Sequence, residues 1–315
     1  MPWTGSRGKP TWQTLAAKFA RRTIPMTPPR YIGRFAPSPT GPLHFGSLVC
    51  ALGSYLDAVA HGGTWLIRME DLDPPREMPG AAERILHSLD VHGLHSPHPV
   101  EWQSKRHHLY QRALDQLQEN NLLYACGCTR EQIRRAGGHR RADCRQGSPV
   151  SGTPAALRFC SEGEDEHFLD LWHGPQSQRT SEDPILKRKD GLFAYQLAVV
   201  VDDIQQGVTW VVRGADLLDC TGVQCQLFRA LGAEPPGFGH LPLVMNETGQ
   251  KLSKQNHAAA LDDRRPTDNL LQALRFLGLR PPVELSLEQP HHLLAWATAH
   301  WQRQQVNRHN RRLHQ

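Results

Sequence analysis

The chain has 315 residues, of which 39% are hydrophobic and 21% are charged. This composition is typical of a soluble globular protein with one large domain or two modest ones. No apolar run approaches the ~20 residues that span a bilayer, which argues against a membrane protein. Seven scattered cysteines, an odd number in so long a chain, argue against a disulfide framework. We therefore expect a monomeric, cytoplasmic protein that does not contact membranes.

The net charge of +5 is unevenly distributed along the chain. Residues 1–30 hold six basic residues and no acid, and the remainder has 30 basic against 31 acidic residues. This balance excludes a globally basic RNA-binding body, so any RNA contact must come from local patches. Candidate patches lie at 105–108, 134–145 and 303–312, and each is equally compatible with an ordinary solvated face.

Residues 1–30 form an acid-poor leader with several arginines, which is compatible with an organellar transit peptide. Met26 lies five residues before the first predicted strand, so a chain that begins there keeps every element of the fold. We therefore expect residues 1–30 to be an extension outside the fold.

The sequence YIGRFAPSPTGPLHFGS at residues 31–47 predicts a strand, a tight loop and the beginning of a helix. Its first residues suit a buried strand, its prolines and glycines exclude regular structure, and an apolar helical pattern follows to Gly62. Such an arrangement points backbone N–H groups and the positive end of the helix dipole at a phosphate. His44 can donate to a phosphate oxygen at the helix start, and Gly46 lets a nucleotide lie close. The alternative is a proline-rich loop before an ordinary amphipathic helix.

A second phosphate-binding feature lies far downstream, at residues 251–254, where the sequence reads KLSK. Two lysines on a loop supply the positive charge that a pentacovalent phosphate transition state needs. Glu70 directly follows the strand predicted at 64–69. Carboxylates just past a strand end lie in the ligand crevice of a doubly wound sheet, so we expect Glu70 to receive an ammonium group.

The remaining patterns predict an α/β chain. Residues 150–180 are polar and irregular, and we expect the acidic run at 162–166 to be solvated. A turn at 189–191 precedes a predicted strand at 195–201, which ends in two aspartates. The other predicted elements are helices at 80–93 and 104–121, a strand at 208–212, a helix that ends at Ala230, a strand at 241–245, and helices at about 267–277 and 287–303.

Together these motifs resemble the class I aminoacyl-tRNA synthetases in their glutamyl form. RFAPSPTGPLHFGS and KLSK are similar to the two ATP motifs of that class, although Ser47 stands where the class usually has histidine. Further similar segments are RMEDLDPPR (68–76), GLFAYQLAVVVDD (191–203) and VVRGADLL (211–218). The resemblance implies an α/β fold with a Rossmann-like parallel-sheet catalytic domain at 31–256, interrupted by a small zinc-binding insert at about 122–180.

The resemblance also implies the binding residues. Arginine's forked donors fit carboxylates, and we expect Arg213 and Tyr195 to hold the side-chain carboxylate of glutamate. Lys251 and Lys254 would neutralise the β- and γ-phosphates of ATP, which Mg²⁺ accompanies. The implied glutamate pocket comprises Arg34, Ala36, Ser38, Glu70, Tyr195 and Arg213, and the implied ATP site comprises His44, Gly46, Lys251 and Lys254, of which His44 and the lysines are catalytic.

Cys126, Cys128 and Cys144 lie close together in the sequence and indicate a tetrahedral metal site, for which zinc is the expected ion. The resembling family has a tyrosine at the position of Arg140, and an arginine cannot coordinate a metal. The neighbouring His139 or a water molecule would then be the fourth ligand. Such a site would be structural, and the alternative is three unrelated thiols in a surface insert.

The short helical C-terminal region predicted at 257–315 is too small for an anticodon-binding domain of the usual kind. The chain therefore resembles the truncated glutamyl-queuosine tRNA(Asp) synthetase family. This implies tRNA-independent activation of L-glutamate and its transfer to the cyclopentenediol of queuosine in the anticodon loop of tRNA(Asp). Charging of a tRNA 3′ end and nucleotidyl transfer to a free metabolite stay open as alternatives. A third alternative is a non-catalytic RNA-binding protein. In such a protein we expect KLSK or His44 to be altered, and both are intact.

Overall fold

The computed structural model describes residues 30–135, 137, 142–146, 152, 154–163, 165–180, 182–246, 249–252 and 259–312. The chain divides into two compact units, 1–30 and 31–315, and only the second is described below. The predictions for the leader, His139 and Lys254 therefore lie outside the described residues. Within the described part of the chain, no helix combines the length and the apolar character needed to cross a membrane.

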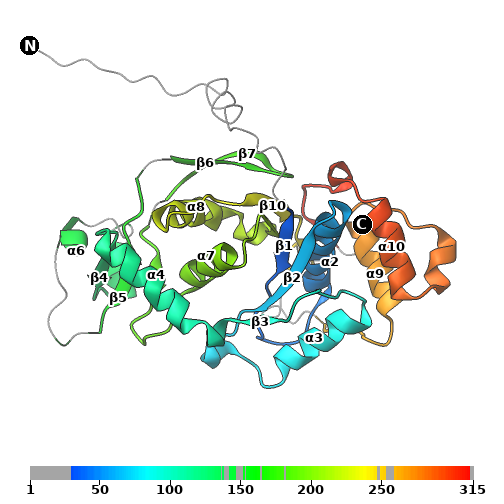
Figure 1. Cartoon of the computed structure of the whole chain (residues 1–315), viewed down its shortest axis with the longest axis horizontal. Coiled ribbons are helices and arrows are strands. Elements are labelled where there is room, and N and C mark those ends of the chain that lie inside the picture. Colours follow the sequence, from blue (N-terminus) through cyan, green and yellow to red (C-terminus); the bar gives the residue numbers. More distant parts are fainter. Residues whose placement is uncertain are drawn as a thin grey trace, which may run out of the picture. The chain divides into compact units, whose positions relative to one another are not determined.

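Parallel strands form the centre of the molecule (Figure 1). All six residues of β2 are buried, because helices cover both faces of such a sheet. The Thr209 amide donates to the Ile32 carbonyl over 2.9 Å and brings β9 beside β1. One sheet has β1 (Ile32–Phe35), β2 (Thr64–Met69) and β3 (Glu101–Trp102) in parallel. In the next sheet β9 (Trp210–Gly214) and β6 (Asp165–Asp170) each pair in parallel with β10 (Gly237–Leu241).

Helices pack on both sides of these strands, as a doubly wound sheet requires (Figure 1). On one side, α2 (Phe45–Ala60) joins α3 (Ala81–Val91), α9 (Pro266–Phe276) and α10 (Pro290–Ala299) in a single hydrophobic cluster. On the other side, α4 (His107–Glu119), α7 (Tyr195–Gln205) and α8 (Thr221–Ala230) form a second cluster. The predicted α/β class and most of the predicted helices are confirmed.

A separate antiparallel sheet, β4-β5-β8, combines two strands of the predicted insert (about 122–180) with β8 just beyond it, beside two short helices. Buried Asp183 fastens this sheet, because it accepts hydrogen bonds from Tyr124 (3.0 Å), Ser161 (2.8 Å) and Arg145 (2.7 Å). Arg145 lies on α6, so α6 is anchored to the sheet by an ion pair. The elements are β4 (Leu123–Cys126), α5 (Arg130–Arg135), α6 (Ala142–Gln146), β5 (Ala156–Phe159) and β8 (Ile185–Lys187).

The strand predicted at 195–201 is wrong, because these residues begin helix α7. Leu197 to Val201 are all buried, so their sequence shows no helical alternation of apolar and polar residues. Their β-branched content favours a strand locally, and tertiary packing overrides that preference. As a result, Asp202 and Asp203 lie on a buried helix instead of beyond a strand end.

The irregular structure predicted at 150–180 is also wrong, since β6 (Asp165–Asp170) and β7 (Gly174–Arg179) form an antiparallel hairpin there. Glu166, placed in a solvated acidic run, is buried and accepts from Arg229 over 2.7 Å. Few apolar residues mark these strands, so polar composition concealed them. The last predicted strand, 241–245, is divided between the end of β10 and the two-residue β11 (Val244–Met245), which pairs with β12 (Arg311–Arg312).

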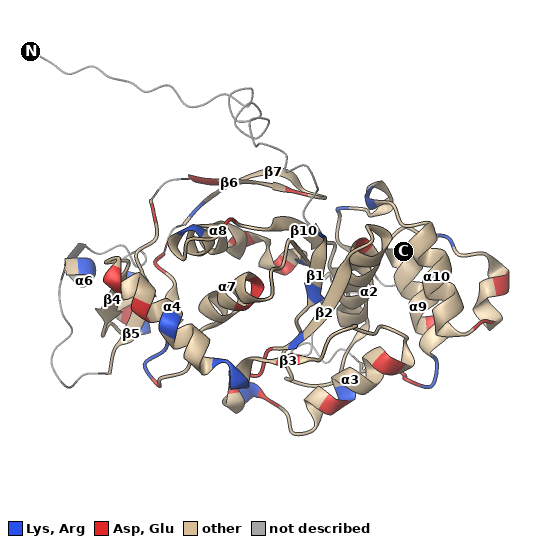
Figure 2. Cartoon of the chain, viewed as in Figure 1, with Lys and Arg blue, Asp and Glu red and all other residues tan. Residues whose placement is uncertain are grey.

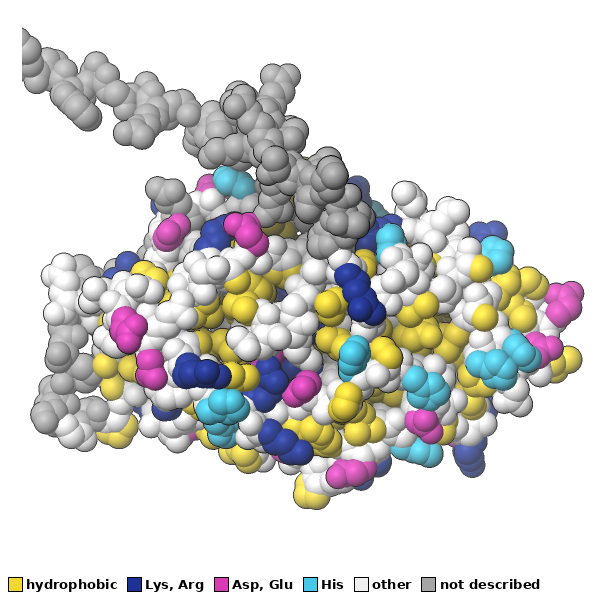
Figure 3. Space-filling view, viewed as in Figure 1, with side chains coloured by type: hydrophobic (Ala, Val, Ile, Leu, Met, Phe, Trp, Pro, Cys, Tyr) yellow, Lys and Arg dark blue, Asp and Glu magenta, His cyan; other side chains and the backbone are white. Residues whose placement is uncertain are grey.

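Charged residues of both signs are spread along the ribbon instead of gathering by sign (Figure 2). The face shown in Figure 3 likewise mixes acidic, basic and histidine side chains with apolar ones. Arg303, from one of the candidate basic patches, has a structural contact: its Nε and Nη2 each donate over 2.8 Å to the buried Asp57 of α2. Part of that patch therefore stabilises the packing of the C-terminal segment.

Candidate active site

One cavity of about 590 Å³ lies where β1, β2 and β9 end beside the beginning of α2. Arg34 comes from β1, Glu70 directly follows β2, and Arg213 comes from β9. The structure therefore brings together every predicted glutamate- or ATP-site residue that it describes. Those on the cavity wall are Arg34, Ala36, Ser38, His44, Gly46, Glu70, Tyr195, Arg213 and Lys251.

His44 is the N-cap of helix α2, and its Nδ1 accepts from the Ser47 amide over 3.3 Å. In a neutral imidazole this leaves the proton on Nε2, which is then a donor for an anion at the helix N-terminus. A Cβ atom at Gly46 would lie 3.1 Å from His44 Cε1 and 3.6 Å from the Leu252 carbonyl oxygen. Glycine at this position therefore keeps the two predicted ATP motifs in close contact.

Lys251 lies on the cavity wall in an ion pair with Asp216, whose Oδ2 is 2.6 Å from the lysine Nζ. Leu252 follows, and its amide donates to the Val244 carbonyl over 2.7 Å. The beginning of the KLSK motif is thus fixed by the edge of β11. Asp216 also lines the cavity, and only its place in the segment VVRGADLL pointed to it in the sequence.

Asp203 is a buried carboxylate behind the cavity that the sequence reasoning did not assign to the site. Its Oδ1 accepts from Arg34 Nε over 3.0 Å and from Arg68 Nη2 over 2.7 Å. Burial opposes its ionisation, but these two cations outweigh burial and hold the pKa of Asp203 below its usual value. The available signal for Asp203 was the pair of aspartates at the end of the apolar run 195–201. The prediction of a strand there, where the structure has helix α7, obscured this signal.

Glu70 is a carboxylate on the cavity wall, beside the cavity arginines. Burial raises its pKa to about 7, with Asp203 and Asp202 acting in the same direction and Arg68 and Arg34 opposing them. Among the described residues none donates a hydrogen bond to this carboxylate. The Glu70 carboxylate is therefore available to a cationic group such as an ammonium.

Arg213 and Tyr195 lie together on the cavity wall, with the arginine Nη1 3.4 Å from the tyrosine hydroxyl oxygen. Burial raises the pKa of Tyr195 to about 12, so its hydroxyl stays protonated and can donate to an anion. Arg213 is itself buried, with 6% of its surface exposed. The pair provides a cation and a neutral donor at one point of the wall, which suits a carboxylate.

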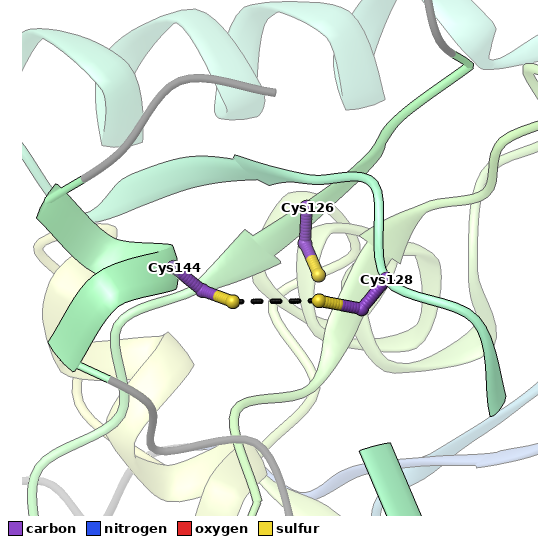
Figure 4. A group of neighbouring side chains, drawn as sticks. All are labelled: Cys126, Cys128 and Cys144. Atoms are coloured by element: carbon purple, nitrogen blue, oxygen red, sulfur yellow. Dashed lines mark hydrogen bonds between the residues drawn. The ribbon is translucent and has the colours of Figure 1, made fainter. Parts of the chain in front are cut away.

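The three predicted cysteines converge in the insert, with their sulfur atoms all within 4.8 Å of one another (Figure 4). The Sγ atoms of Cys128 and Cys144 are 3.5 Å apart, whereas a tetrahedral zinc ion with bonds of about 2.3 Å holds its sulfurs about 3.8 Å apart. Lys189 Nζ donates to the carbonyls of Gly127 (2.9 Å) and Cys128 (3.0 Å). The donor set fits a zinc ion, and among the described residues no fourth His, Cys, Asp or Glu ligand joins it.

Residues 32–289 match the family of class I tRNA synthetases (E and Q), catalytic domain. A solved glutamate tRNA ligase from Elizabethkingia meningosepticum, in complex with its amino acid, has the same fold, with a TM-score of 0.76 at 24% identity. The match covers 90% of this chain and 67% of that one. The family match, which spans most of the chain, makes this the catalytic domain of a class I aminoacyl-tRNA synthetase.

Curated relatives of this chain indicate which family within the class it belongs to. The glutamyl-Q tRNA(Asp) synthetase of Vibrio cholerae is 49% identical over 283 residues, which cover 89% of this chain and 93% of the relative. The enzyme of the same name from Salmonella typhimurium is 52% identical over 284 residues, with 88% and 93% coverage. The chain belongs to the glutamyl-Q tRNA(Asp) synthetase family, a group of ligases.

Proposed function

We propose that this chain activates L-glutamate with ATP, without tRNA, and transfers the glutamyl group to queuosine in the anticodon loop of tRNA(Asp). One observation carries the activation step: a single cavity brings an arginine-tyrosine pair, a carboxylate and a helix N-terminus to one substrate-sized space. Glutamate has two carboxylates and an ammonium group, which match these partners. The names of the relatives support the acceptor.

In this proposal Glu70 binds the ammonium group of glutamate, and Arg213 with Tyr195 binds its side-chain carboxylate. The α-carboxylate then attacks the α-phosphorus of ATP, a new O–P bond forms, and the bond to the bridging oxygen of pyrophosphate breaks. No protein nucleophile is needed, so the residues act by positioning and charge stabilisation. Mg²⁺, which accompanies ATP, would neutralise part of the phosphate charge.

The ATP phosphates lie at the beginning of α2 in this proposal. The Nε2 proton of His44 and the backbone amides of the first helical turn donate to phosphate oxygens. Lys251, held by Asp216, and Lys254 neutralise the charge that develops on the departing pyrophosphate. In the second step a hydroxyl of the cyclopentenediol attacks the glutamyl carbonyl, an ester forms and AMP leaves.

We also propose a structural zinc ion held by Cys126, Cys128 and Cys144, with His139 or water as the fourth ligand. Three converging thiols carry this proposal. The ion would crosslink β4 to α6 and supply no chemistry to the cavity.

The whole function is tested with labelled glutamate, ATP and two matched preparations of tRNA(Asp), one with queuosine and one without it. Label should enter only the queuosine-containing tRNA, and it should stay there when the 3′-terminal nucleoside has been removed. Label confined to intact 3′ ends would replace the proposal by ordinary tRNA charging. Pyrophosphate exchange without any glutamate requirement would overturn the activation step itself.

A further inference from the structure

A buried histidine lies directly behind the cavity arginine. His240 on β10 is paired in register with Arg213 on β9, and no part of its side chain is exposed. Arg213 Nε donates to His240 Nε2 over 3.0 Å. Phe238 packs on both, stacked on the imidazole and lying 5.6 Å beneath the guanidinium carbon. His240 does not line the cavity, so it reaches a ligand only through Arg213.

The tautomer of His240 is set from its other side. Its Nδ1 lies 2.6 Å from Oδ2 of Asp170, which is also buried. The Oδ1 of Asp170 accepts from the amides of Trp172 (3.0 Å) and His173 (2.9 Å). Although burial opposes ionisation, the bonds from His240 and these amides hold the pKa of Asp170 below its usual value. An ionised carboxylate only accepts, so the imidazole proton is on Nδ1 and the lone pair of Nε2 faces Arg213.

The imidazole stays neutral in this arrangement. Burial, with Arg213 and His173 acting in the same direction, outweighs Asp170 and lowers the pKa of His240. Arg213 Nε therefore donates to an uncharged acceptor. The imidazole of His240 separates the Asp170 carboxylate from the Arg213 guanidinium, so these two groups form no direct ion pair.

Arg34 and Arg213 on the cavity wall consequently differ in their charge balance. Arg34 is in a direct ion pair with Asp203. Within the described part of the chain, Arg213 contacts no carboxylate and donates only to neutral acceptors. These are His240 Nε2, Tyr195 Oη, Gln224 Oε1, Thr221 Oγ1, the Leu217 carbonyl and Cys220 Sγ. A buried cation without a direct counter-ion is costly, and an anion that enters the cavity removes that cost.

We propose that His240, fixed by Asp170, is the positioning residue that keeps Arg213 aimed at the cavity with its charge uncompensated, and that this makes the pocket select a carboxylate over an isosteric amide. The inference rests on the proposed function, because it concerns the choice between glutamate and glutamine in the activation step. A neutral amide leaves the guanidinium without its anion. The same cavity therefore accepts glutamate and rejects glutamine.

The tautomer is tested first in the unmodified chain, by long-range ¹H–¹⁵N correlation spectra of the imidazole rings with His240→Gln used to assign the signal. We expect His240 to be neutral, with Nδ1 protonated, between pH 6 and 8. A proton on Nε2, or a charged ring over that range, would overturn the inference without any activity measurement.

Asp170→Asn is the sharpest variant because it is isosteric. The amide oxygen of the new asparagine keeps the hydrogen bonds from the backbone amides of Trp172 and His173. Its NH₂ group therefore faces His240 Nδ1, and the imidazole proton moves to Nε2. The Nε2–H of His240 and the Nε–H of Arg213 are then two donors that face each other, and the hydrogen bond between them is lost. We expect the KM for glutamate to rise about 10- to 100-fold, as for loss of a hydrogen bond to a charged group, while the KM for ATP changes less than about twofold.

His240→Leu and His240→Gln separate positioning from packing. Leucine removes the acceptor, and we expect the same rise in KM and a fall in the preference for glutamate over glutamine of about tenfold or more. The His240→Gln variant restores an acceptor oxygen beside Arg213. The KM of this variant for glutamate should lie within about fivefold of the unmodified value. His92→Gln is the matched control, since His92 is a fully buried histidine bonded at both nitrogens to Ser88 and Asn269, away from the cavity.

The outcomes separate this inference from the proposed function. An unmodified chain without glutamate-dependent exchange refutes the proposed function, and the tautomer measurement still decides the histidine's state. An active chain whose Asp170→Asn and His240→Leu variants keep both KM and selectivity refutes the inference alone. Equal losses in the leucine and glutamine variants, with unchanged selectivity, would assign His240 to packing and also refute it.

Discussion

Asp203 holds Arg34 at the cavity wall, with its Oδ1 3.0 Å from the arginine Nε and its Oδ2 3.3 Å from Nη2. Both side chains are nearly inaccessible to water, and Arg68 shares the same carboxylate. A helix on one side of the sheet therefore determines the position of a cavity residue on the first strand. This contact connects residues 169 positions apart in the sequence.

Asp203→Asn should disturb both the fold and the glutamate site. It leaves two buried arginines short of one counter-ion, so we expect the free energy of unfolding to fall by about 3 kcal/mol or more. The KM for glutamate should rise because Arg34 loses its fixed position. Urea unfolding and pyrophosphate exchange measure the two effects. Asp71→Asn is the control, since Asp71 bonds the exposed Ser104; equal behaviour of the two variants would remove Asp203 from the site.

Glutamate binding should depend on pH through Glu70. Burial raises the pKa of this carboxyl to about 7, and only the ionised form can pair with an ammonium group. The charged fraction rises with pH, so the KM for glutamate should fall about tenfold between pH 6 and pH 8 and then level off. Exchange assays across this range give the profile. The profile should be flat in Glu70→Gln, and a pH-dependent KM in that variant would assign the titration to another group.

The predictable part of the site consists of short motifs whose chemistry is local. His44, Gly46 and Glu70 could be placed because a strand, a loop and a helix start specify their own geometry. Asp203 and His240 could not, because they act on partners brought near by other strands and helices. The helix α7 was mistaken for a strand for a related reason: burial on all sides removes the polar face from which helical periodicity is recognised.

Lys251→Ala should lower the rate of glutamate activation by about 10²-fold while leaving the KM for glutamate nearly unchanged. The lysine lies on the cavity wall beside Asp216 and would act on the leaving pyrophosphate, which is absent from the ground-state glutamate complex. We expect Lys254→Ala to behave similarly, on the strength of the KLSK motif. Lys105→Ala is the control, since Lys105 lies over the Trp102 ring. A loss confined to glutamate affinity would contradict the role of both motif lysines.

Cys144→Ser should release the zinc ion without unfolding the insert. Arg145, the next residue, is anchored to buried Asp183, so α6 keeps one attachment after the metal is lost. We expect about one zinc per chain in the unmodified protein and a loss of most of it in the variant, measured by metal analysis. Cys160→Ser is the matched control, because Cys160 is outside the cluster. Equal zinc content in the two variants would refute the site.

The acceptor prediction concerns a short RNA. We expect transfer of glutamate to an isolated anticodon stem-loop that carries queuosine, because the proposed acceptor is a diol on a splayed loop base and not the tRNA 3′ end. Binding should weaken steeply with salt, since contacts to phosphate supply most of the affinity. The matched control is the same stem-loop with guanosine in place of queuosine, which should bind with similar salt dependence but accept no glutamate. Transfer to an unmodified tRNA(Glu) transcript at its 3′ end, with none to the queuosine stem-loop, would contradict the prediction and favour ordinary charging.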